Sequence, residues 1–220
     1  MEKSYSIIIP IYNEIESISP LLDKLKYFNE LGHEIVIVDD GSVDGSTFIL
    51  EKNNFINLIA LKNNEGKGNA IKKGLKSSKY DKIILYDGDL ELSTIQIEKL
   101  MVLKRDSKIH FVLSKRVPKI RFFSVWDIGN FIFTKLFNIM NGSDLEDALC
   151  CAKSFYKSDL DLENLKSTSF DIDVEISTKL LRKHRNPKIV SLDYIRRYRK
   201  DGKKLALKDS LTILKRILNS

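Results

Sequence analysis

Acidic side chains gather at three points of this sequence, each directly after a short apolar run. They are Glu14, Asp39, Asp40, Asp87, Asp89 and Glu91. If the runs are parallel strands, their carboxyl ends share one edge of a sheet, where carboxylates repel one another unless a cation or a hydrogen-bonding ligand lies between them. Hard oxygen ligands suit Mg²⁺ or Mn²⁺, which bind one or two protein carboxylates together with substrate phosphates. The pattern therefore predicts a divalent metal and a diphosphate at this edge.

Residues 87–91 carry the densest part of this pattern. Alternate residues at a strand end point to the same side, so Asp87, Asp89 and Glu91 are the predicted metal ligands. Gly88 allows another group to approach the backbone closely. A solvated acidic turn is the alternative for an isolated Asp-x-Asp pair, but the two other acidic loops favour the metal.

A glycine-containing loop at residues 64–70 offers a second way to contact phosphate. It carries Gly66, Lys67 and Gly68 and opens a predicted helix, whose first N–H groups are suited to phosphate. Its spacing lacks both the P-loop and the dinucleotide-binding fingerprints, which argues against kinases and dehydrogenases.

The elements that must position these residues alternate between strand and helix. Apolar residues at i, i+3 and i+4 predict a helix, whereas the runs around it are continuous, as in strands buried on both faces. The predicted strands are 6–11, 34–38, 58–61 and 82–86, and the predicted helices are 17–28, 47–53 and 68–77. Right-handed crossovers then give an α/β fold with three layers, in which a mainly parallel sheet lies between helices.

The second half of the chain has a different pattern. It predicts a helix at 94–103, a strand at 109–113, an aromatic-rich stretch at 122–140 and an amphipathic helix at 208–218. Asp127, Asn130 and Lys135 interrupt the aromatic stretch, so it either packs on the core or lies against a membrane surface rather than spanning it. Because no apolar run reaches the length of a spanning helix and no signal sequence is evident, we expect a soluble or peripheral protein.

Charge is distributed unevenly along the 220 residues, which carry a formal net charge of +7. Residues 182–216 contain 13 Lys or Arg and 3 Asp, so the remainder is slightly acidic. A basic end suits nucleic acid, an anionic membrane or a phosphate-bearing ligand. The acidic loops oppose nucleic acid, so no nucleic-acid partner is expected.

Cysteine and histidine contribute little to the predicted chemistry. Cys150 and Cys151 are adjacent, which disfavours a bridge between them, and two cysteines are too few for a structural zinc site. A reducing compartment fits this usage. The three histidines, His33, His110 and His184, lie outside every motif and are expected to be structural or on the surface.

The order of these motifs resembles the GT-A glycosyltransferases of family 2, and among them the dolichol- and polyprenyl-phosphate sugar synthases. The resemblance covers residues 6 to about 218 and implies a Rossmann-like GT-A domain over 1–220, with a nucleotide-sugar half (1–115) and an acceptor half (116–220) that ends in helices. Together with the glycine loop, it predicts these substrate-binding residues: Pro10, Tyr12, Asn13, Glu14, Val38, Asp40, Lys67, Asp87, Gly88 and Arg116. Family members more often have Ala and Gln at the positions of Gly88 and Glu91.

The acceptor half carries the signal for the subgroup. Residues 147–155 resemble the family's segment near the acceptor, so Asp147 is expected to orient an acceptor or, in the alternative, to act as a base. The basic residues from 194 to 205 resemble a loop that grips phosphates and implicate Arg197 and Lys203. With the metal ligand Asp89, these three residues are the predicted catalytic set.

These features predict an inverting, metal-dependent enzyme that moves a hexose from a GDP- or UDP-sugar to a polyprenyl or dolichyl phosphate. Because a phosphate monoester is already anionic near neutral pH, it needs little help from a base, whereas a hydroxyl acceptor does need one. A family 2 enzyme that acts on a saccharide or another hydroxyl is the enzymatic alternative, and a catalytically inactive binding protein is the other. The expected location is the cytoplasmic face of a membrane, reached through the amphipathic segments or a membrane-anchoring protein.

Overall fold

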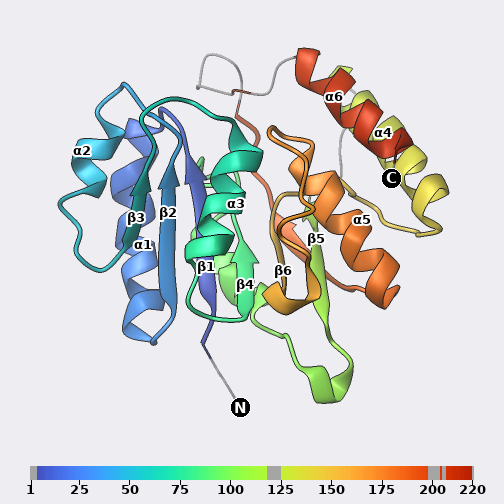
Figure 1. Cartoon of the computed structure of the whole chain (residues 1–220), viewed down its shortest axis with the longest axis horizontal. Helices are drawn as coiled ribbons and strands as arrows, with labels where there is room; N and C mark the ends of the chain where they lie inside the picture. The colour runs from blue at the N-terminus through green and yellow to red at the C-terminus, as the bar shows by residue number, and fades with distance from the viewer. Residues whose placement is uncertain (1–3, 118–124, 198–203, 205–206, 220) are drawn as a thin grey trace.

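A seven-stranded sheet forms the middle of the computed structural model, which describes residues 4–117, 125–197, 204 and 207–219 (Figure 1). Its strand order is β3 (Asn57–Ala60), β2 (Glu34–Asp39), β1 (Ser6–Ile11), β4 (Lys82–Leu85), β6 (Lys153–Tyr156), β5 (Phe111–Val117) and β7 (Lys188–Asp193). Strand β6 is antiparallel to both of its neighbours, and every other pair is parallel. The prediction of a mainly parallel sheet is confirmed.

Helices cover both faces of this sheet. One face packs against α1 (Ile15–Glu30), α2 (Ser46–Leu50) and the 3₁₀ helix η1 (Thr94–Leu100). The other packs against α3 (Lys67–Ser77) and α5 (Ile172–His184), with α4 (Val125–Asn141) and α6 (Leu207–Leu218) beside them. Figure 1 shows α3 and α5 in front of the sheet and α4 and α6 side by side. The molecule is therefore a three-layer α/β structure, as predicted.

Strand β1 shows why continuous apolar runs give this architecture. Ile7 and Ile9 are fully buried in the core under α1, while Ile8, which points to the opposite face, is fully buried in the core under α3. Both faces of the strand therefore contribute hydrophobic burial, worth about 25 cal/mol for each Å² removed from water. A strand with one polar face could not occupy this central position.

The second half departs from the prediction at three elements. The helix expected at 94–103 is the shorter 3₁₀ helix η1, and the sequence pattern did not reveal β6 or β7. From residue 125 onward the aromatic stretch lies in α4, in which Phe137 is fully buried and Phe131 is nearly half exposed, whereas Phe122 and Phe123 lie outside the described residues. In the part of the chain that the structure describes, no helix combines the length and the apolar character needed to cross a bilayer.

Topology brings the acidic loops to one edge. Strands β1, β2 and β4 are parallel neighbours, so the loops that follow Ile11, Asp39 and Leu85 open on the same side of the sheet. Because β5 and β7 run in that direction as well, residues 116 and 194–197 also lie at this edge. We call it the acidic edge.

Candidate active site

Two cations from the C-terminal part of the chain contact the acidic edge through Glu14. The carboxylate of Glu14, only 8% exposed, accepts a hydrogen bond from Arg197 Nη1 at 2.6 Å and another from Lys204 Nζ at 2.7 Å. Lys204 also donates to the carbonyl oxygen of Asn13 at 2.9 Å. Charge-assisted bonds of this kind are about twice as strong as neutral ones. The contacts join residues that are more than 180 positions apart in sequence.

Arg197 also contacts Asp89 and Glu91, two further acidic residues of the edge. Its Nη1 donates to the carbonyl oxygen of Asp89 at 3.1 Å, and its backbone N–H donates to Glu91 Oε1 at 2.8 Å. The backbone N–H of Ile195 donates to the carbonyl oxygen of Glu91 at 2.8 Å. Arg197 therefore lies among the acidic loops.

The carboxyl group of Asp89 is short of positive charge. Its burial, together with the nearby carboxylates of Asp87 and Glu91, raises the pKa of Asp89 to about 7. The backbone N–H of Glu91 donates a hydrogen bond to Asp89 Oδ1 at 3.0 Å. Leu90, which lies between Asp89 and Glu91 in the sequence, adopts a left-handed conformation with φ of +60°. Such a conformation is costly for a branched residue and persists only where the surroundings enforce it. A divalent cation would relieve the repulsion at this point.

Asp87 is held by a chain of four alternating charges, which begins at the partly exposed Asp87 and Lys67 and ends at the buried Asp173 and Lys153 of the acceptor half. Lys67 Nζ contacts Asp87 Oδ1 at 2.8 Å and Asp173 Oδ2 at 3.1 Å, and Lys153 Nζ contacts Asp173 Oδ1 at 3.0 Å. Lys153 is completely buried and also donates to Ser177 Oγ at 3.2 Å. We call this run of alternating charges the buried charge chain. Lys67, predicted to bind substrate, here holds a carboxylate.

Two of the three predicted metal ligands already have partners within the protein. Lys67 pairs with Asp87, and the backbone of Arg197 pairs with Glu91. Among the described residues, His110, Asp159 and His184 form a group of three possible metal ligands whose ligand atoms lie within 4.8 Å of one another. Asp87, Asp89 and Glu91 do not form such a group. The oxygen chemistry and the raised pKa of Asp89 fit a divalent cation, which would have to compete with Lys67 for Asp87.

Asp40 and the glycine loop are bonded to each other. Asp40 Oδ1 accepts from the backbone N–H of Glu65 at 2.8 Å, and Oδ2 accepts from that of Gly66 at 2.9 Å. Burial raises the pKa of Asp40 in spite of these bonds. The N–H of Gly68 donates to the carbonyl oxygen of Thr168 at 3.0 Å, so this helix start contacts another loop. Asp40 positions the loop, and its carboxylate oxygens already accept two bonds.

Asp147 and Arg116, predicted as a catalytic and a substrate-binding residue, bind each other. Arg116 Nε donates to Asp147 Oδ2 at 2.7 Å and Nη2 donates to Oδ1 at 2.8 Å, a bidentate ion pair. Burial alone would raise the pKa of Asp147, but the Arg116 guanidinium outweighs burial and lowers it. Tyr194 lies against the guanidinium, with its ring centre 5.3 Å from Cζ. Asp147 is thus a paired anion and a weak base.

The remaining predicted residues lie in different surroundings. Val38 is fully buried in the core, so its side chain contacts protein alone. A side chain at Gly88 would meet Ile11 Cδ1 at 2.1 Å, so the group that approaches this glycine belongs to β1. Pro10 and Tyr12 are partly exposed at the end of β1. Lys203 lies outside the described residues.

Several residues that form the site were not predicted. Asp173 and Lys153 are separated from Asp87 by more than 60 positions, and no local pattern marks them as its partners. Lys204 directly follows the predicted Lys203, so the basic loop was the sequence feature that could have indicated Lys204 as a site residue. Outside this site, His110, Asp159 and His184 were also not predicted to lie together, because their positions in the sequence form no metal-binding motif.

Comparison with known proteins identifies the family that these motifs resemble. The model of "Glycosyl transferase family 2" matches residues 6–160, more than half of the chain. Undecaprenyl-phosphate 4-deoxy-4-formamido-L-arabinose transferases from Yersinia pestis (strain Pestoides F) and Yersinia pseudotuberculosis (serotype O:3, strain YPIII) are 37% identical over 107 residues. These residues are 45% of this chain and 33% of each relative, so the matched region spans about a third of those proteins.

Solved structures share the fold over nearly the whole chain. Glucosyl-3-phosphoglycerate synthase of Mycobacterium tuberculosis with UDP has a TM-score of 0.75 at 14% identity, covering 99% of this chain and 79% of that one. The same enzyme with Mn²⁺, UDP and glucosyl-3-phosphoglycerate has a TM-score of 0.74 at 13% identity, with the same coverage. Mannosyl-3-phosphoglycerate synthase of Rubrobacter xylanophilus has a TM-score of 0.72 at 16% identity, covering 98% and 72%. At these identities the likeness establishes the GT-A fold.

Proposed function

Because this chain belongs to glycosyl transferase family 2, we propose that it transfers a sugar from a nucleotide-sugar donor to a polyprenyl phosphate, with inversion at the anomeric carbon. The relatives named as undecaprenyl-phosphate sugar transferases support this acceptor class. The observation that carries the proposal is the meeting of Arg197 with Glu14, Asp89 and Glu91 at the acidic edge. A site for a diphosphate and its cation needs both signs of charge, and this edge supplies both.

The donor is assigned to the half formed by residues 1–115. Asp87, Asp89 and Glu91 would hold Mg²⁺ or Mn²⁺, and Asp89 is the strongest candidate because its carboxyl group is buried among other carboxylates. The neighbouring structure with Mn²⁺ and UDP supports a metal of this kind. When bound, such a cation supplies positive charge to the nucleoside diphosphate that leaves.

The chain's own cations stabilise the same leaving group. Arg197 and Lys204 both contact Glu14, and a diphosphate that entered the edge would offer them stronger anionic partners. Lys203, from the same basic loop, is proposed to join them. Since Arg197 and Lys204 are already placed at the edge, they need little reorganisation as negative charge develops on the departing phosphate.

The pairing of Asp147 favours a phosphate acceptor over a hydroxyl. A hydroxyl nucleophile needs a base, but Asp147 is held by Arg116 in a bidentate pair that lowers its pKa. A phosphate monoester is already ionised and needs a cation to orient it, a role suited to Arg116. We therefore assign the acceptor to the half formed by residues 116–220, with Asp147 as the residue that positions Arg116.

A surface on α4 suits contact with a membrane that carries such a lipid. Side chains spaced by three or four residues form one exposed stripe along this helix, which we call the α4 stripe: Ile128, Phe131, Ile132, Lys135 and Ile139. Helix α6 packs beside α4 and exposes Leu211 and Leu218. Exposed apolar groups with interspersed cations are typical of helices that lie in the headgroup region. We propose that the protein works at the cytoplasmic face of a membrane, directly or through an anchoring partner.

A transfer assay tests this function. Labelled GDP- and UDP-hexoses, and nucleotide-linked 4-deoxy-4-formamido-L-arabinose, are each incubated with the full chain, Mn²⁺, undecaprenyl phosphate and a mixture of sugar acceptors. We expect an acid-labile product in the organic phase. Asp89→Ala should lose metal-dependent turnover with its fold intact, and Glu163→Gln, which removes an exposed carboxylate far from the edge, should retain it. Label found only on the sugar acceptors would reject the lipid phosphate, and full turnover by Asp89→Ala would reject the metal ligand.

A further inference from the structure

We propose that His110, Asp159 and His184 form a second metal site, separate from the acidic edge, which takes a transition-metal ion of the Zn²⁺ class. Each residue offers one ligand atom, and these atoms all lie within 4.8 Å of one another. Two imidazoles and one carboxylate are a frequent ligand set for Zn²⁺, whereas Mg²⁺ prefers oxygen alone. The proposal is independent of the glycosyl transfer proposed above.

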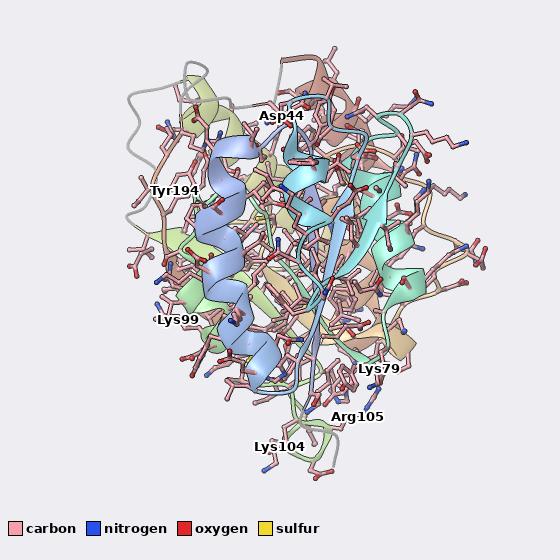
Figure 2. All side chains as sticks on the ribbon, turned by 90° about the vertical axis from the view of Figure 1, so that its left-hand side faces the viewer. Asp44, Lys79, Lys99, Lys104, Arg105 and Tyr194 are labelled. Carbon is pink, nitrogen blue, oxygen red and sulfur yellow. The ribbon has the colours of Figure 1, made fainter. Side chains whose placement is uncertain are left out.

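Three elements bring these residues together at the far end of the sheet. His110 directly precedes β5, Asp159 ends the 3₁₀ helix η3 (Lys157–Asp159) and His184 ends α5. Because β5 is parallel to β1, its start lies at the edge opposite the acidic loops. Figure 2 shows the two ends: Asp44, from the loop after β2, lies at the top, and Arg105, whose Nη1 is 3.7 Å from Asp159 Oδ1, lies at the bottom.

His110 supplies the observation that points to a ligand. Its Nδ1 is buried and has no hydrogen-bond partner within the part of the chain that the structure describes. A buried polar atom left unpaired costs about 1–3 kcal/mol. In the tautomer that carries its proton on Nε2, the unpartnered Nδ1 of His110 has a lone pair to offer. A bound metal would use that lone pair.

The carboxylate of Asp159 would give the ion its negative charge. It is 4% exposed and accepts from His184 Nε2 at 2.8 Å, while Lys183 Nζ lies 2.9 Å from its other oxygen. Lys183 and Arg105 are each nearly half exposed, at 46% and 45%, so both can turn into solvent when a divalent ion takes their place. These two cations compete with the metal, and the affinity of the site should depend on them.

Some movement of the rings is needed to complete the site. The two imidazoles are stacked, with centroids 4.1 Å apart and planes 7° apart. Lone pairs lie in the ring planes, so one ring must tilt before both nitrogens can point at one ion. In a tetrahedral site with bonds of about 2.0–2.1 Å, the ligand atoms are about 3.3 Å apart, so atoms that now lie within 4.8 Å of one another need to close by about 1.5 Å at most. Water would fill the fourth position.

Metal titration of the full, tag-free, metal-depleted chain tests this inference. Zn²⁺ binding is measured by calorimetry and Co²⁺ binding by its visible spectrum, both with excess Mg²⁺ present to occupy oxygen sites. We expect one equivalent of Zn²⁺ to bind, a tetrahedral Co²⁺ spectrum, and a rise in melting temperature. His110→Ala should weaken binding at least tenfold, while His33→Ala, which removes a histidine outside the cluster, should leave it unchanged.

Two further variants make the result decisive. Lys183→Ala should tighten binding because it removes a competing cation from Asp159. Asp159→Asn keeps the size of the side chain and should weaken binding as His110→Ala does, and circular dichroism checks that both variants fold. Absence of stoichiometric binding to the wild type, or equal affinity in the wild type and both ligand variants, would overturn the proposal. Weaker binding in Lys183→Ala would contradict the competition that the structure implies.

Discussion

The buried charge chain makes Asp173→Asn the most informative stability variant. Asp173 lies between Lys153, which is completely buried, and Lys67, at 3.0 and 3.1 Å from their ammonium groups. Replacing the carboxylate by a neutral amide leaves the charge of Lys153 without a carboxylate partner in the interior, whereas Lys67 keeps its pair with Asp87. Removal of one partner from a buried pair costs about 3–5 kcal/mol, a large part of the stability of an ordinary domain.

Urea denaturation followed by circular dichroism measures this loss. With a slope of about 3 kcal/mol per molar urea, the midpoint should fall by about 1–1.7 M. Glu163→Gln is the matched control, because Glu163 pairs with Lys76 at 2.9 Å where both side chains are more than half exposed, and an exposed pair is worth about 0–1 kcal/mol. The double variant Lys153→Met/Asp173→Asn should lose less than the sum of its single changes, since Met removes the charge that Asp173→Asn leaves without a partner. If Asp173→Asn lowers the midpoint no more than Glu163→Gln, the reasoning about buried charge is refuted.

Three other predictions use the same logic of pairing and space. Asp147→Asn should destabilise the fold by about 3 kcal/mol in urea denaturation because it strands the largely buried Arg116, and a loss below about 1 kcal/mol would contradict this. Gly66→Ala should cost at least about 1–3 kcal/mol, since its φ is +94° and the new methyl carbon would lie 2.3 Å from a backbone carbonyl oxygen; an unchanged melting temperature would contradict the clash. Burial lowers the pKa of His33 below 6.5, so the unfolded chain binds the proton more readily and the stability due to this residue is lost as the pH falls below that value. Between about pH 7.5 and 5.5, the melting temperature of His33→Gln should therefore fall less steeply with decreasing pH than that of the wild type. The Gln side chain can still accept the hydrogen bond from the Tyr5 N–H, and equal slopes for the two proteins would exclude this role of His33.

The first half of the fold could be predicted because its strands are marked locally. Residues 6–11 and 34–39 are continuous apolar runs, and such runs are buried on both faces whatever lies elsewhere in the chain. Parallel neighbours then place the loops after them on one edge, so the acidic edge followed from strand order alone. Strand β6 escaped prediction because it begins with a lysine whose burial depends on a carboxylate 20 residues further on.

The partners within the site could not be predicted in the same way. The glycine loop and the family resemblance predicted Lys67 and Arg116 as ligand-binding residues, but the fold gives each a carboxylate partner, Asp87 and Asp147. Which cation meets which anion depends on the packing of α5 and of the C-terminal segment against the sheet. The pairing with Arg116 lowers the pKa of Asp147, and this bears directly on the acceptor class proposed above.

Phosphorus NMR of the lipid acceptor tests the central proposal most directly. Undecaprenyl phosphate is a phosphate monoester, and sugar transfer to it produces a diester with a distinct ³¹P resonance. With the matching nucleotide sugar and the diamagnetic Mg²⁺, we predict that the monoester signal is replaced by a diester signal and that the anomeric configuration of the bound sugar is opposite to that of the donor. A lipid signal that stays that of the monoester while the donor is consumed, with the sugar recovered on a hydroxyl or in free form, would contradict the proposed function.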